Sequence, residues 1–335
     1  MIPIQPIFEK YKDLSIAVFG DYCLDEYLWV DASLNEVSLE TGNIAYQCVR
    51  REVAPGAAGN IVKNLILLGV GTVYAVGVVG NDGRGLELCR ELDSLGVNRS
   101  CLVTTDDRDT PTYTKPWLMD NGNVRELNRI DIKNWTPTPS QIEDTLTENL
   151  DSIVGKIDAL IIMDQITEEN HGTVTARMRN ELARIAKNNP KLIVYADSRN
   201  RIGQFENMII KGNQHEITKA AFGKEDLSNV AAACEILQQK TGQPIICTVG
   251  EKGLRIYNNG EITEVPGIAV TGQVDVTGAG DSVTAGLVSA LAAGATMEQA
   301  AQIGNAAAAV CVKQVGSSGK VTTDDILNIL QKGMV

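Results

Sequence analysis

The sequence predicts an α/β protein with a mostly parallel central sheet. Short apolar runs alternate along the chain with longer segments of helical period, which is typical of strand–helix–strand units. Strands covered by helices on both faces are apolar throughout. This pattern predicts strands at 15–20, 72–80, 158–164, 191–197 and 244–250. Several of these runs end in Gly or Asp, at the edge where parallel sheets bind ligands.

Helical periodicity fills the intervals between these strands. Helices are predicted at 56–69, 83–95, 140–155, 167–188 and 226–241. A hairpin centred on Asn258, Asn259 and Gly260 follows the last strand. The C-terminal third then predicts three further helices, at 279–294, 296–313 and 322–332.

Two segments, 30–53 and 110–131, interrupt this rhythm with a looser polar and apolar alternation. The second contains Asn121-Gly122, a strong hairpin signal. We expect a small antiparallel sheet that projects from the main domain. It would be a lid over the active site, an oligomer contact or an ordinary surface hairpin. Because no Pro-, Gly- or Ser-rich linker divides the chain, residues 1–335 are predicted to form one domain with this lid.

Composition excludes several classes of function. The formal net charge of −12 argues against nucleic acid or an anionic membrane surface as the main partner. Seven scattered cysteines without a C-x-x-C motif argue against a disulfide framework. The N-terminus does not resemble a signal peptide, and no stretch approaches the roughly 20 apolar residues of a membrane span. We therefore expect a soluble, cytoplasmic protein. With only two histidines, neither a zinc site nor a Ser-His-Asp triad is expected.

The stretch DVTGAGDSVTAGLVSALAAG at 275–294 carries the most specific chemistry. It predicts a helix that starts after the small loop Gly278-Ala279-Gly280, where unpaired amide groups and the helix dipole favour an anion. Asp281 lies in the first turn and would stay ionised at neutral pH, able to accept a proton from a hydroxyl. These parts suit phosphoryl transfer to an alcohol. The structural alternative is that Asp281 only stabilises the start of the helix, as an aspartate does near any helix N-terminus.

This stretch resembles the D-T-x-G-A-G-D signature of the ribokinase, or PfkB, family of carbohydrate kinases, with Val276 at the usual Thr. Four further motifs resemble that family in the same order: GAAGN at 56–60, VVGNDGRG at 78–85, NQHE at 213–216 and TVGEKG at 248–253. The resemblance implies a ribokinase-like three-layer α/β/α sandwich with a β lid. It also implies ATP-dependent phosphorylation of a sugar or sugar-phosphate hydroxyl, with Mg²⁺ as cofactor.

The resemblance also implies roles for individual residues. Asp281 would be the general base, and Gly278, Ala279 and Gly280 the anion hole. The residues implied on the nucleotide side are Asn213 and Glu216 (through Mg²⁺ and its waters), Arg199, Thr248, Gly250, Gly253 and Asn305. The residues implied in the acceptor pocket are Asp25, Gly56, Ala57 and Asn60, with Asp164 as a further contact. A monovalent cation such as K⁺ would bind at Asp275, Thr277 and Gly316.

Two of these assignments have plain structural alternatives. The pair Asn213 and Glu216 also reads as a helix cap, which is compatible with a role near Mg²⁺. Arg199 would be a phosphate clamp or an ordinary surface arginine.

The branch most similar in its motifs is that of the heptose-phosphate kinases of ADP-heptose synthesis. GDYCLDEY, APGAAGN, TPTYTK and NRID carry this likeness. A nucleoside kinase of the same fold and a catalytically inactive sugar- or nucleotide-binding relative remain as alternatives. The expected partner is a small-molecule sugar or sugar phosphate, and the lid predicts a homodimer.

Overall fold

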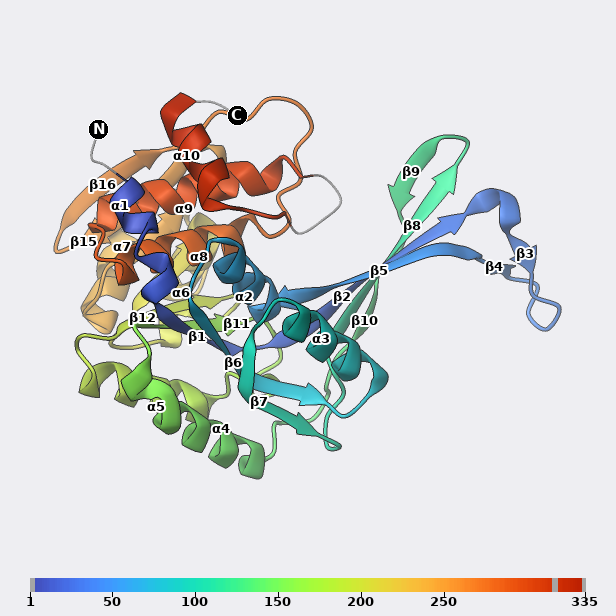
Figure 1. Ribbon diagram of the computed structural model, residues 1–335, viewed down its shortest axis with the longest axis horizontal. Helices are drawn as coiled ribbons and strands as arrows, with labels where there is room; N and C mark the ends of the chain where they lie inside the picture. Colours follow the sequence, from blue (N-terminus) through green and yellow to red (C-terminus); the bar gives the residue numbers. More distant parts are fainter. Residues whose placement is uncertain (1–3, 315–318, 333–335) are drawn as a thin grey trace.

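A nine-stranded sheet forms the centre of the computed structural model, which describes residues 4–314 and 319–332 (Figure 1). In spatial order its strands are β16 (Glu261–Pro266), β15 (Gly253–Asn258), β14 (Ile245–Thr248), β13 (Ile209–Asn213), β12 (Ile193–Ser198), β11 (Ala159–Asp164), β1 (Ser15–Gly20), β6 (Thr72–Gly80) and β7 (Asn98–Thr105). The seven strands from β14 to β7 pair in parallel, and β15 and β16 add an antiparallel hairpin.

Helices cover both faces of this sheet and bury one hydrophobic core on each. One face carries α1 (Gln5–Phe8), α2 (Ala58–Leu67), α3 (Gly83–Ser94), α8 (Ala279–Ala292), α9 (Met297–Val312) and α10 (Thr323–Lys332). The other carries α4 (Ser140–Ile153), α5 (Ala176–Asn188), α6 (Gln214–Phe222) and α7 (Val230–Thr241). The predicted three-layer α/β/α sandwich is therefore confirmed.

Strand β1 shows why the buried strands lack polar alternation. Successive side chains of a strand point to opposite faces, so Ile16 and Val18 enter the core under α2 and α8. Ala17 and Phe19 enter the core under α4 and α5. All four are 0% exposed. A strand buried on both sides has no solvent face, and an apolar run is the result.

Most predicted elements form close to the expected bounds, but the helix predicted at 167–188 begins only at Ala176. Thr175 caps it, accepting a hydrogen bond from the Met178 amide at 3.2 Å. Before it, Asn170 takes φ of 62°, which a continuous helix excludes. Short 3₁₀ turns lie at Tyr11–Asp13, Ala32–Leu34, Val154–Lys156, Ile202–Gln204, Leu227–Asn229 and Gly250–Lys252.

Two parallel strands, β7 and β13, were absent from the prediction. Strand β7 lies at the sheet edge and has few buried residues, so it lacks a continuous apolar run. Strand β13 is five residues long, and its apolar start is followed at once by Lys211, Gly212 and Asn213. Neither pattern meets the length or apolarity used to recognise a buried strand.

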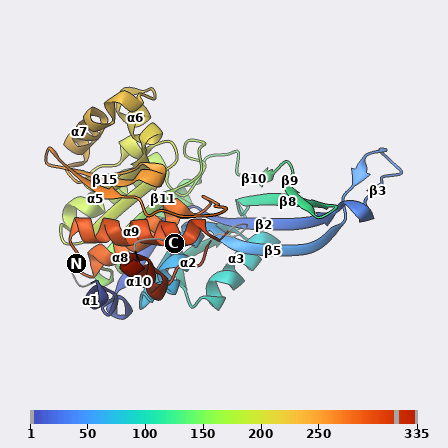
Figure 2. The same cartoon turned by 90° about the horizontal axis from the view of Figure 1, so that it is seen from above.

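A second sheet projects from the body as the expected lid (Figures 1 and 2). Its strands are β10 (Ile130–Ile132), β8 (Thr112–Asp120), β2 (Tyr22–Asp31) and β5 (Cys48–Ala57), with β9 (Asn123–Glu126) paired to β8. The prediction of an antiparallel lid is wrong for its central pair, because β2 and β8 run parallel. Strand β2 follows β1 and strand β8 follows β7, so the two enter the lid from different places in the main sheet. A hairpin signal concerns only strands adjacent in sequence and does not reveal this pairing.

Turns of the lid follow the sequence signals more closely. Asn121 and Gly122 both take positive φ, 48° and 82°, and connect β8 to β9 as a tight hairpin. A small pair, β3 (Glu36–Val37) and β4 (Ile44–Ala45), forms the far tip of the lid. Asn259 and Gly260 likewise turn β15 into β16 with φ of 51° and 80°. Within the described ranges, no helix is long and apolar enough to cross a membrane.

Candidate active site

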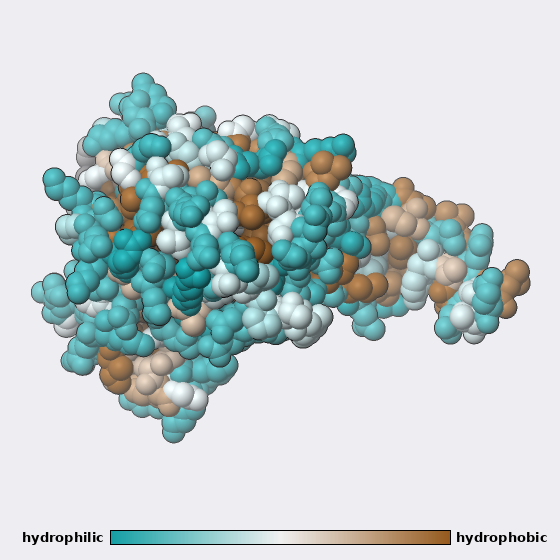
Figure 3. Space-filling view, turned by 90° about the horizontal axis from the view of Figure 1, so that it is seen from below, coloured by the Kyte–Doolittle hydropathy of each residue, from teal (hydrophilic) through white to brown (hydrophobic). Residues whose placement is uncertain are grey.

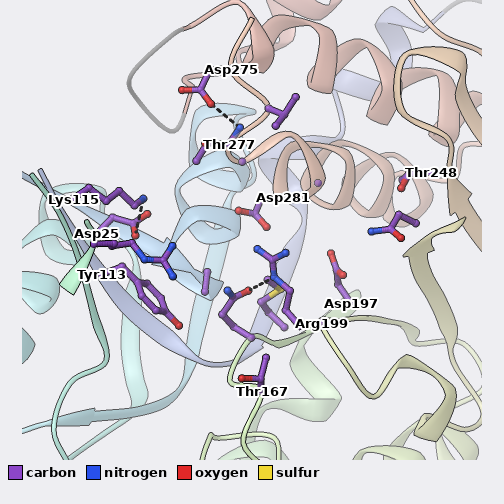
Figure 4. Close-up of a pocket in the computed structure, with 18 of the residues that line it drawn as sticks. Asp25, Tyr113, Lys115, Thr167, Asp197, Arg199, Thr248, Asp275, Thr277 and Asp281 are labelled. Atoms are coloured by element: carbon purple, nitrogen blue, oxygen red, sulfur yellow. Dashed lines mark hydrogen bonds and ion pairs between the residues drawn. The ribbon is translucent and has the colours of Figure 1, made fainter. Parts of the chain in front are cut away.

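A large cavity, about 1240 Å³, opens between the carboxyl ends of the parallel strands and the lid (Figure 4). One wall comes from the lid, one from the ends of β11 to β14, and one from the loop that leads into α8. Among the residues predicted for the site, those that line this cavity are Asp25, Ala57, Arg199, Asn213, Glu216, Thr248, Asp275, Thr277, Gly278, Gly280 and Asp281.

Asp281 lies in the first turn of α8, directly after the anion loop. Gly278 caps this helix with φ of 77°, a conformation that glycine adopts without strain. Ala279 donates its amide to the carbonyl of Val276 at 3.2 Å, which closes the loop on itself. The following amides stand at the start of the helix, where they have no partner inside it. The helix end therefore offers hydrogen-bond donors to an anion in the cavity.

The Asp281 carboxylate is held by Asn60, whose Nδ2 donates to Oδ2 at 2.6 Å. Burial raises the pKa of Asp281 from its ordinary value to about 6, while the bond from Asn60 lowers it. The negative charge of Asp197 raises the pKa further, and the ammonium group of Lys211 opposes it. At neutral pH the group is mostly ionised, and its affinity for a proton is well above that of a surface aspartate. A pKa close to the working pH suits a general base.

Lys211 and Asp197 form a buried ion pair beside the anion loop. The two residues are register partners on the adjacent strands β13 and β12. A methyl group added to Gly280 would lie only 3.3 Å from Lys211 Nζ, so the ammonium group faces the loop closely. Burial is the largest influence on Lys211 and lowers its pKa, but the charge and hydrogen bond of Asp197, with the charges of Glu216 and Asp281, together raise the pKa above its ordinary value. The site therefore keeps a permanent positive charge next to the amides of α8.

Asn213 and Glu216 begin α6 as a capping box. The Asn213 side chain accepts from the Glu216 amide at 2.9 Å, and Glu216 Oε2 accepts from the Asn213 amide at 2.8 Å. Burial raises the pKa of Glu216, and the neighbouring charge of Asp197 adds to this shift. Asn213 and Glu216 therefore cap α6 and also line the cavity.

The donor set on this wall fits Mg²⁺ bound jointly with phosphate groups. Among residues 4–314 and 319–332, no three His, Cys, Asp or Glu side chains come together as a metal site. Two carboxylates, Asp197 and Glu216, nevertheless crowd the same wall. Mg²⁺ characteristically uses one or two carboxylates, with waters and substrate phosphates completing its shell.

Asp25 stands on the opposite wall, on lid strand β2. Its Oδ1 forms an ion pair with Lys115 Nζ at 3.3 Å, and each of these side chains is 13% exposed. A methyl group on Gly56 would come within 3.0 Å of the Asp25 carboxylate carbon, so glycine is needed there for close approach. Ala57 follows with φ of 50°, an uncommon and strained conformation for a residue with a side chain.

Alternate residues of β2 and β8 present one polar and aromatic face to the cavity. Asp25 and Tyr27 on β2 are register partners of Tyr113 and Lys115 on β8. Lys115 Nζ also lies 4.8 Å from the centre of the Tyr27 ring. Burial is the largest influence on Lys115 and lowers its pKa, but the charge of Asp25 and the hydrogen bonds to Tyr27 and Asp25 together raise the pKa above its ordinary value. Trp117 continues the same face toward the lid tip.

Further cations reach the cavity from the end of the lid and from the sheet edge. Arg129 stacks over the Tyr113 ring at 5.1 Å and pairs with Asp131 at 2.7 Å. Lys133 pairs with Glu168 at 3.1 Å. Arg199, which follows β12, is exposed and donates weakly to the Gln165 side chain at 3.4 Å.

Asp164, Asn305, Gly250 and Gly253 are among the predicted residues that do not line the cavity. Asp164 is 1% exposed and binds the Arg201 guanidinium and the Ser198 hydroxyl, so its carboxylate is turned away from the acceptor. Asn305 donates to the carbonyl of Pro266 at 2.6 Å and ties α9 to β16. Gly250 and Gly253 bound a 3₁₀ turn, and a side chain on Gly253 would collide with the Val265 carbonyl.

The other predicted residues that are absent from the cavity lining are Ala279, whose amide bonds to the Val276 carbonyl, and Asn60, Gly56 and Gly316. Asn60 and Gly56 act through Asp281 and Asp25 rather than on the cavity surface. Gly316 lies outside the described residues.

Several cavity residues were not recognised from the sequence: Asp197 as a charge partner, Lys211, Lys115, Arg129 and Lys133. A weak signal existed for Lys211, because it stands two residues before the pair Asn213 and Glu216, which was already assigned to the ligand edge of the sheet. Lys115 had a weaker one, the alternation of Tyr113, Lys115 and Trp117 along a strand.

The fold and the cavity define a phosphotransferase with an alcohol acceptor, in which a poised carboxylate stands beside an anion-binding helix end. The chain belongs to the pfkB family carbohydrate kinases, whose family model matches residues 15–324. The family resemblance predicted from the motifs is thereby confirmed.

Individual relatives agree with this assignment. The chain is 29% identical over 312 residues to the "Bifunctional protein HldE" of Helicobacter hepaticus, which agrees with the predicted heptose-phosphate kinase branch. That match covers 92% of this chain but 62% of the relative's length. Among solved structures, Arabidopsis thaliana ribokinase complexed with ribose and ATP matches with a TM-score of 0.71 and 19% identity, covering 95% of this chain and 99% of that one. Escherichia coli phosphofructokinase-2 in complex with potassium matches with a TM-score of 0.69 and 17% identity, covering 96% and 99%.

Proposed function

We propose that the protein transfers the γ-phosphoryl group of ATP to a hydroxyl of a sugar that already carries a phosphate. The observation that carries this proposal is that Asp25 from the lid and Asp281 from α8 line one cavity, together with the anion loop. Figure 4 shows both carboxylates directed into that cavity from different elements. An acceptor held by Asp25 can therefore present a hydroxyl to Asp281.

In the proposed reaction Asp281 takes the proton from the acceptor hydroxyl. The acceptor oxygen forms a bond to the γ-phosphorus, the bond from that phosphorus to the bridging oxygen breaks, and ADP leaves. Amides at the start of α8 and the ammonium group of Lys211 stabilise the charge on the transferring group. Mg²⁺, held near Asp197 and Glu216 through its waters, would neutralise the nucleotide phosphates when bound.

Three cations on the acceptor side support a phosphorylated sugar. Lys115, Arg129 and Lys133 line the lid wall of the cavity, on the opposite side from the nucleotide residues Thr248 and Asn213. A guanidinium group and an ammonium group together suit a phosphate, which accepts several charge-assisted hydrogen bonds. An uncharged sugar would use only the hydroxyl contacts near Asp25.

The first test is ATP consumption with Mg²⁺ against matched pairs of acceptors, such as hexoses and heptoses with and without a terminal phosphate. We expect kcat/KM to be larger for the phosphorylated member of a pair, and an Arg129→Met variant to erase most of that difference. Preference for nucleosides would instead favour the nucleoside kinase, for which Tyr113 and Trp117 offer stacking surfaces. Nucleotide binding without any turnover would identify an inactive relative.

The second test removes the proposed base. Asp281→Asn should lower kcat by about 10²- to 10⁴-fold, the range typical of a general base, while nucleotide affinity survives. Asp144→Asn is a matched control, because Asp144 is an exposed carboxylate that pairs with Arg177 on the surface. Unchanged turnover in Asp281→Asn would exclude the proposed role.

We also propose that the chain forms a single kinase domain whose lid pairs with the lid of a second copy. Exposed apolar side chains cluster on the lid and appear as brown patches on the projecting part in Figure 3. The exposed large apolar or aromatic side chains of the lid are Leu34, Val37, Leu39, Ile44, Tyr46, Val49, Val124 and Ile130. A patch of this kind usually marks an interaction surface.

A further inference from the structure

Asp21 is a buried carboxylate that the proposed mechanism does not use. It connects β1 to β2 and is 3% exposed. Its Oδ2 accepts hydrogen bonds from the amides of Gln165 at 2.8 Å and Ile166 at 2.9 Å. Its Oδ1 accepts from the amide of Thr173 at 2.6 Å. A buried charge needs such partners, and this one binds both ends of the loop that joins β11 to α5.

Arg201 holds the same loop from the other side. Its guanidinium group is buried and donates to the carbonyl of Ile166 and, at 2.9 Å, to the carbonyl of Thr167. It also pairs with Asp164, the last residue of β11. Ile166 therefore has its amide bound by Asp21 and its carbonyl bound by Arg201. Two buried charges of opposite sign fix the backbone at this residue.

The loop is shaped to fit closely around Asp21. A methyl group added to Gly172 would lie 2.6 Å from Asp21 Oδ1, so glycine is needed for this approach. The Thr138 hydroxyl donates to the Gly172 carbonyl at 2.7 Å, and the Thr138 amide donates to the Asn170 carbonyl at 2.7 Å. Residues 165–175 form neither helix nor strand, yet hydrogen bonds hold them along their length.

Two side chains of this loop reach the candidate active site. Gln165 and Thr167 both line the cavity, and Figure 4 shows Thr167 at the opposite end of it from Asp275. Gln165 Oε1 accepts from Arg199 Nε at 3.4 Å. Among the residues that the structure describes, none accepts a hydrogen bond from the amide nitrogen of Gln165. The fixed loop therefore offers this nitrogen as a donor on the cavity wall.

We propose that Gln165 is a specificity-determining residue whose amide nitrogen donates to an acceptor hydroxyl other than the one phosphorylated, and that Asp21 is the positioning residue that fixes it there. The inference rests on the proposed kinase function and deepens it. Asp25 accepts a hydrogen bond from a hydroxyl on the lid wall, whereas Gln165 donates to a hydroxyl on the wall formed by the strand ends. The acceptor is then a polyhydroxylated sugar with two recognised hydroxyls besides the reacting one.

The first experiment compares the best acceptor of the proposed kinase assay with its monodeoxy analogues, each lacking one hydroxyl. In Gln165→Leu, kcat/KM for the full acceptor should fall by about three- to tenfold, the value of one neutral hydrogen bond, mainly through KM. For one analogue, which lacks the partner hydroxyl, it should not change, and KM for ATP should stay constant. Gln238→Leu is the matched control, because Gln238 donates to Asn258 on the surface at 3.1 Å.

Two results would overturn the role of Gln165. One is an equal loss of kcat/KM for the full acceptor and every analogue, which would indicate an effect on the fold alone. The other is a loss only of the preference for phosphorylated acceptors, which would place the nitrogen on the phosphate.

The second experiment tests the positioning role of Asp21. Asp21→Asn keeps the size but replaces one oxygen by an NH₂ group, which cannot accept from the loop amides. Hydrogen exchange across 165–173 should become faster, and discrimination against the same analogue should fall. Adding Gln165→Leu should lower that discrimination no further, because both changes remove one interaction. Asp158→Asn is the control, since Asp158 Oδ2 accepts from the Ser15 amide at 2.8 Å at the start of β1.

Faster exchange with intact discrimination, or full additivity of the two changes, would contradict the positioning role. If Asp21→Asn does not fold, Gln165→Leu decides alone, because Gln165 is half-buried on the cavity wall. If no acceptor is phosphorylated, the proposed function fails, and recognition is scored by the rise in melting temperature that each sugar causes. The inference then fails if no sugar raises it, or if Gln165→Leu responds to every sugar as the unaltered protein does.

Discussion

The hydrogen bond from Asn60 to Asp281 predicts the pH dependence of the reaction. Asn60 donates to a carboxylate whose pKa is raised by burial to about 6, and this bond favours the ionised form. Replacement by leucine, Asn60→Leu, keeps a similar size and removes the donor. The pKa of Asp281 should therefore rise, and the acidic limb of the pH profile should move to higher pH.

The size of the shift follows from the strength of the bond. A hydrogen bond to a charged group contributes about 1.5 to 3 kcal/mol, and one pKa unit corresponds to about 1.4 kcal/mol. Allowing for partial replacement by water, we expect the limb to move from about 6 to about 7. The ionised fraction of Asp281 at pH 6 then falls about fivefold, whereas at pH 8 it changes by only about a tenth.

The assay is kcat/KM for the acceptor from pH 5 to 9, at saturating Mg²⁺ and ATP, for the unaltered protein and two variants. Asn64→Leu is the control, because Asn64 lies on the same helix face but contacts Ser282 instead of Asp281. We expect its acidic limb to stay near that of the unaltered protein. An Asn60→Leu limb that does not move, or that moves to lower pH, would refute the link between this bond and the base.

Three further predictions concern stability and assembly. Asp281→Asn should stabilise the ligand-free protein at pH 7 by up to about 3 kcal/mol. The pKa of Asp281 is about 6 in the folded protein and 3.8 in the unfolded chain, so ionisation of this group lowers the free energy of unfolding as pH rises from 3.8 to about 6. In urea unfolding the gain should therefore disappear at pH 4. Ala57→Gly should raise the free energy of unfolding by about 1 kcal/mol, since glycine adopts a φ of 50° without strain, and a lower value would contradict the strain argument. Leu39→Asp, at a lid position that is 98% exposed, should shift the protein from dimer to monomer in sedimentation velocity, while an equal monomer content in both proteins would count against the lid interface.

The main sheet could be predicted from the sequence because its strands have no solvent face. Residues 16–19 alternate between two helix layers, and burial on both sides leaves a continuous apolar run that local reading detects. Strand β7 has a partly exposed edge position and escaped the same reading. The parallel pairing of β2 with β8 escaped it too, because pairing between strands some 80 residues apart is set by tertiary packing.

In the candidate site too, local motifs could be predicted from the sequence, whereas contacts between separate elements could not. The anion loop and Asp281 form one continuous motif, so a local pattern sufficed to select them. The ion pair of Lys211 with Asp197 arises from the register of two neighbouring strands, which no single motif contains. Asp164 ends β11 and Asp197 is the last residue but one of β12, yet only Asp197 lines the cavity, because Arg201 binds the Asp164 carboxylate. A strand end predicts proximity to a ligand and not the direction of a side chain.

Lid strand β5 continues without a loop into helix α2, and Ala57 is the joint between them. Ala57 stands three residues before Asn60, whose amide binds the Asp281 carboxylate, so a change in the direction of β5 at this joint would reach that amide within one turn of α2. A change in lid position at the acceptor would therefore also change the hydrogen bond from Asn60 to Asp281, and with it the pKa of the proposed base. Acceptors that bind without moving the lid would leave that pKa at its ligand-free value.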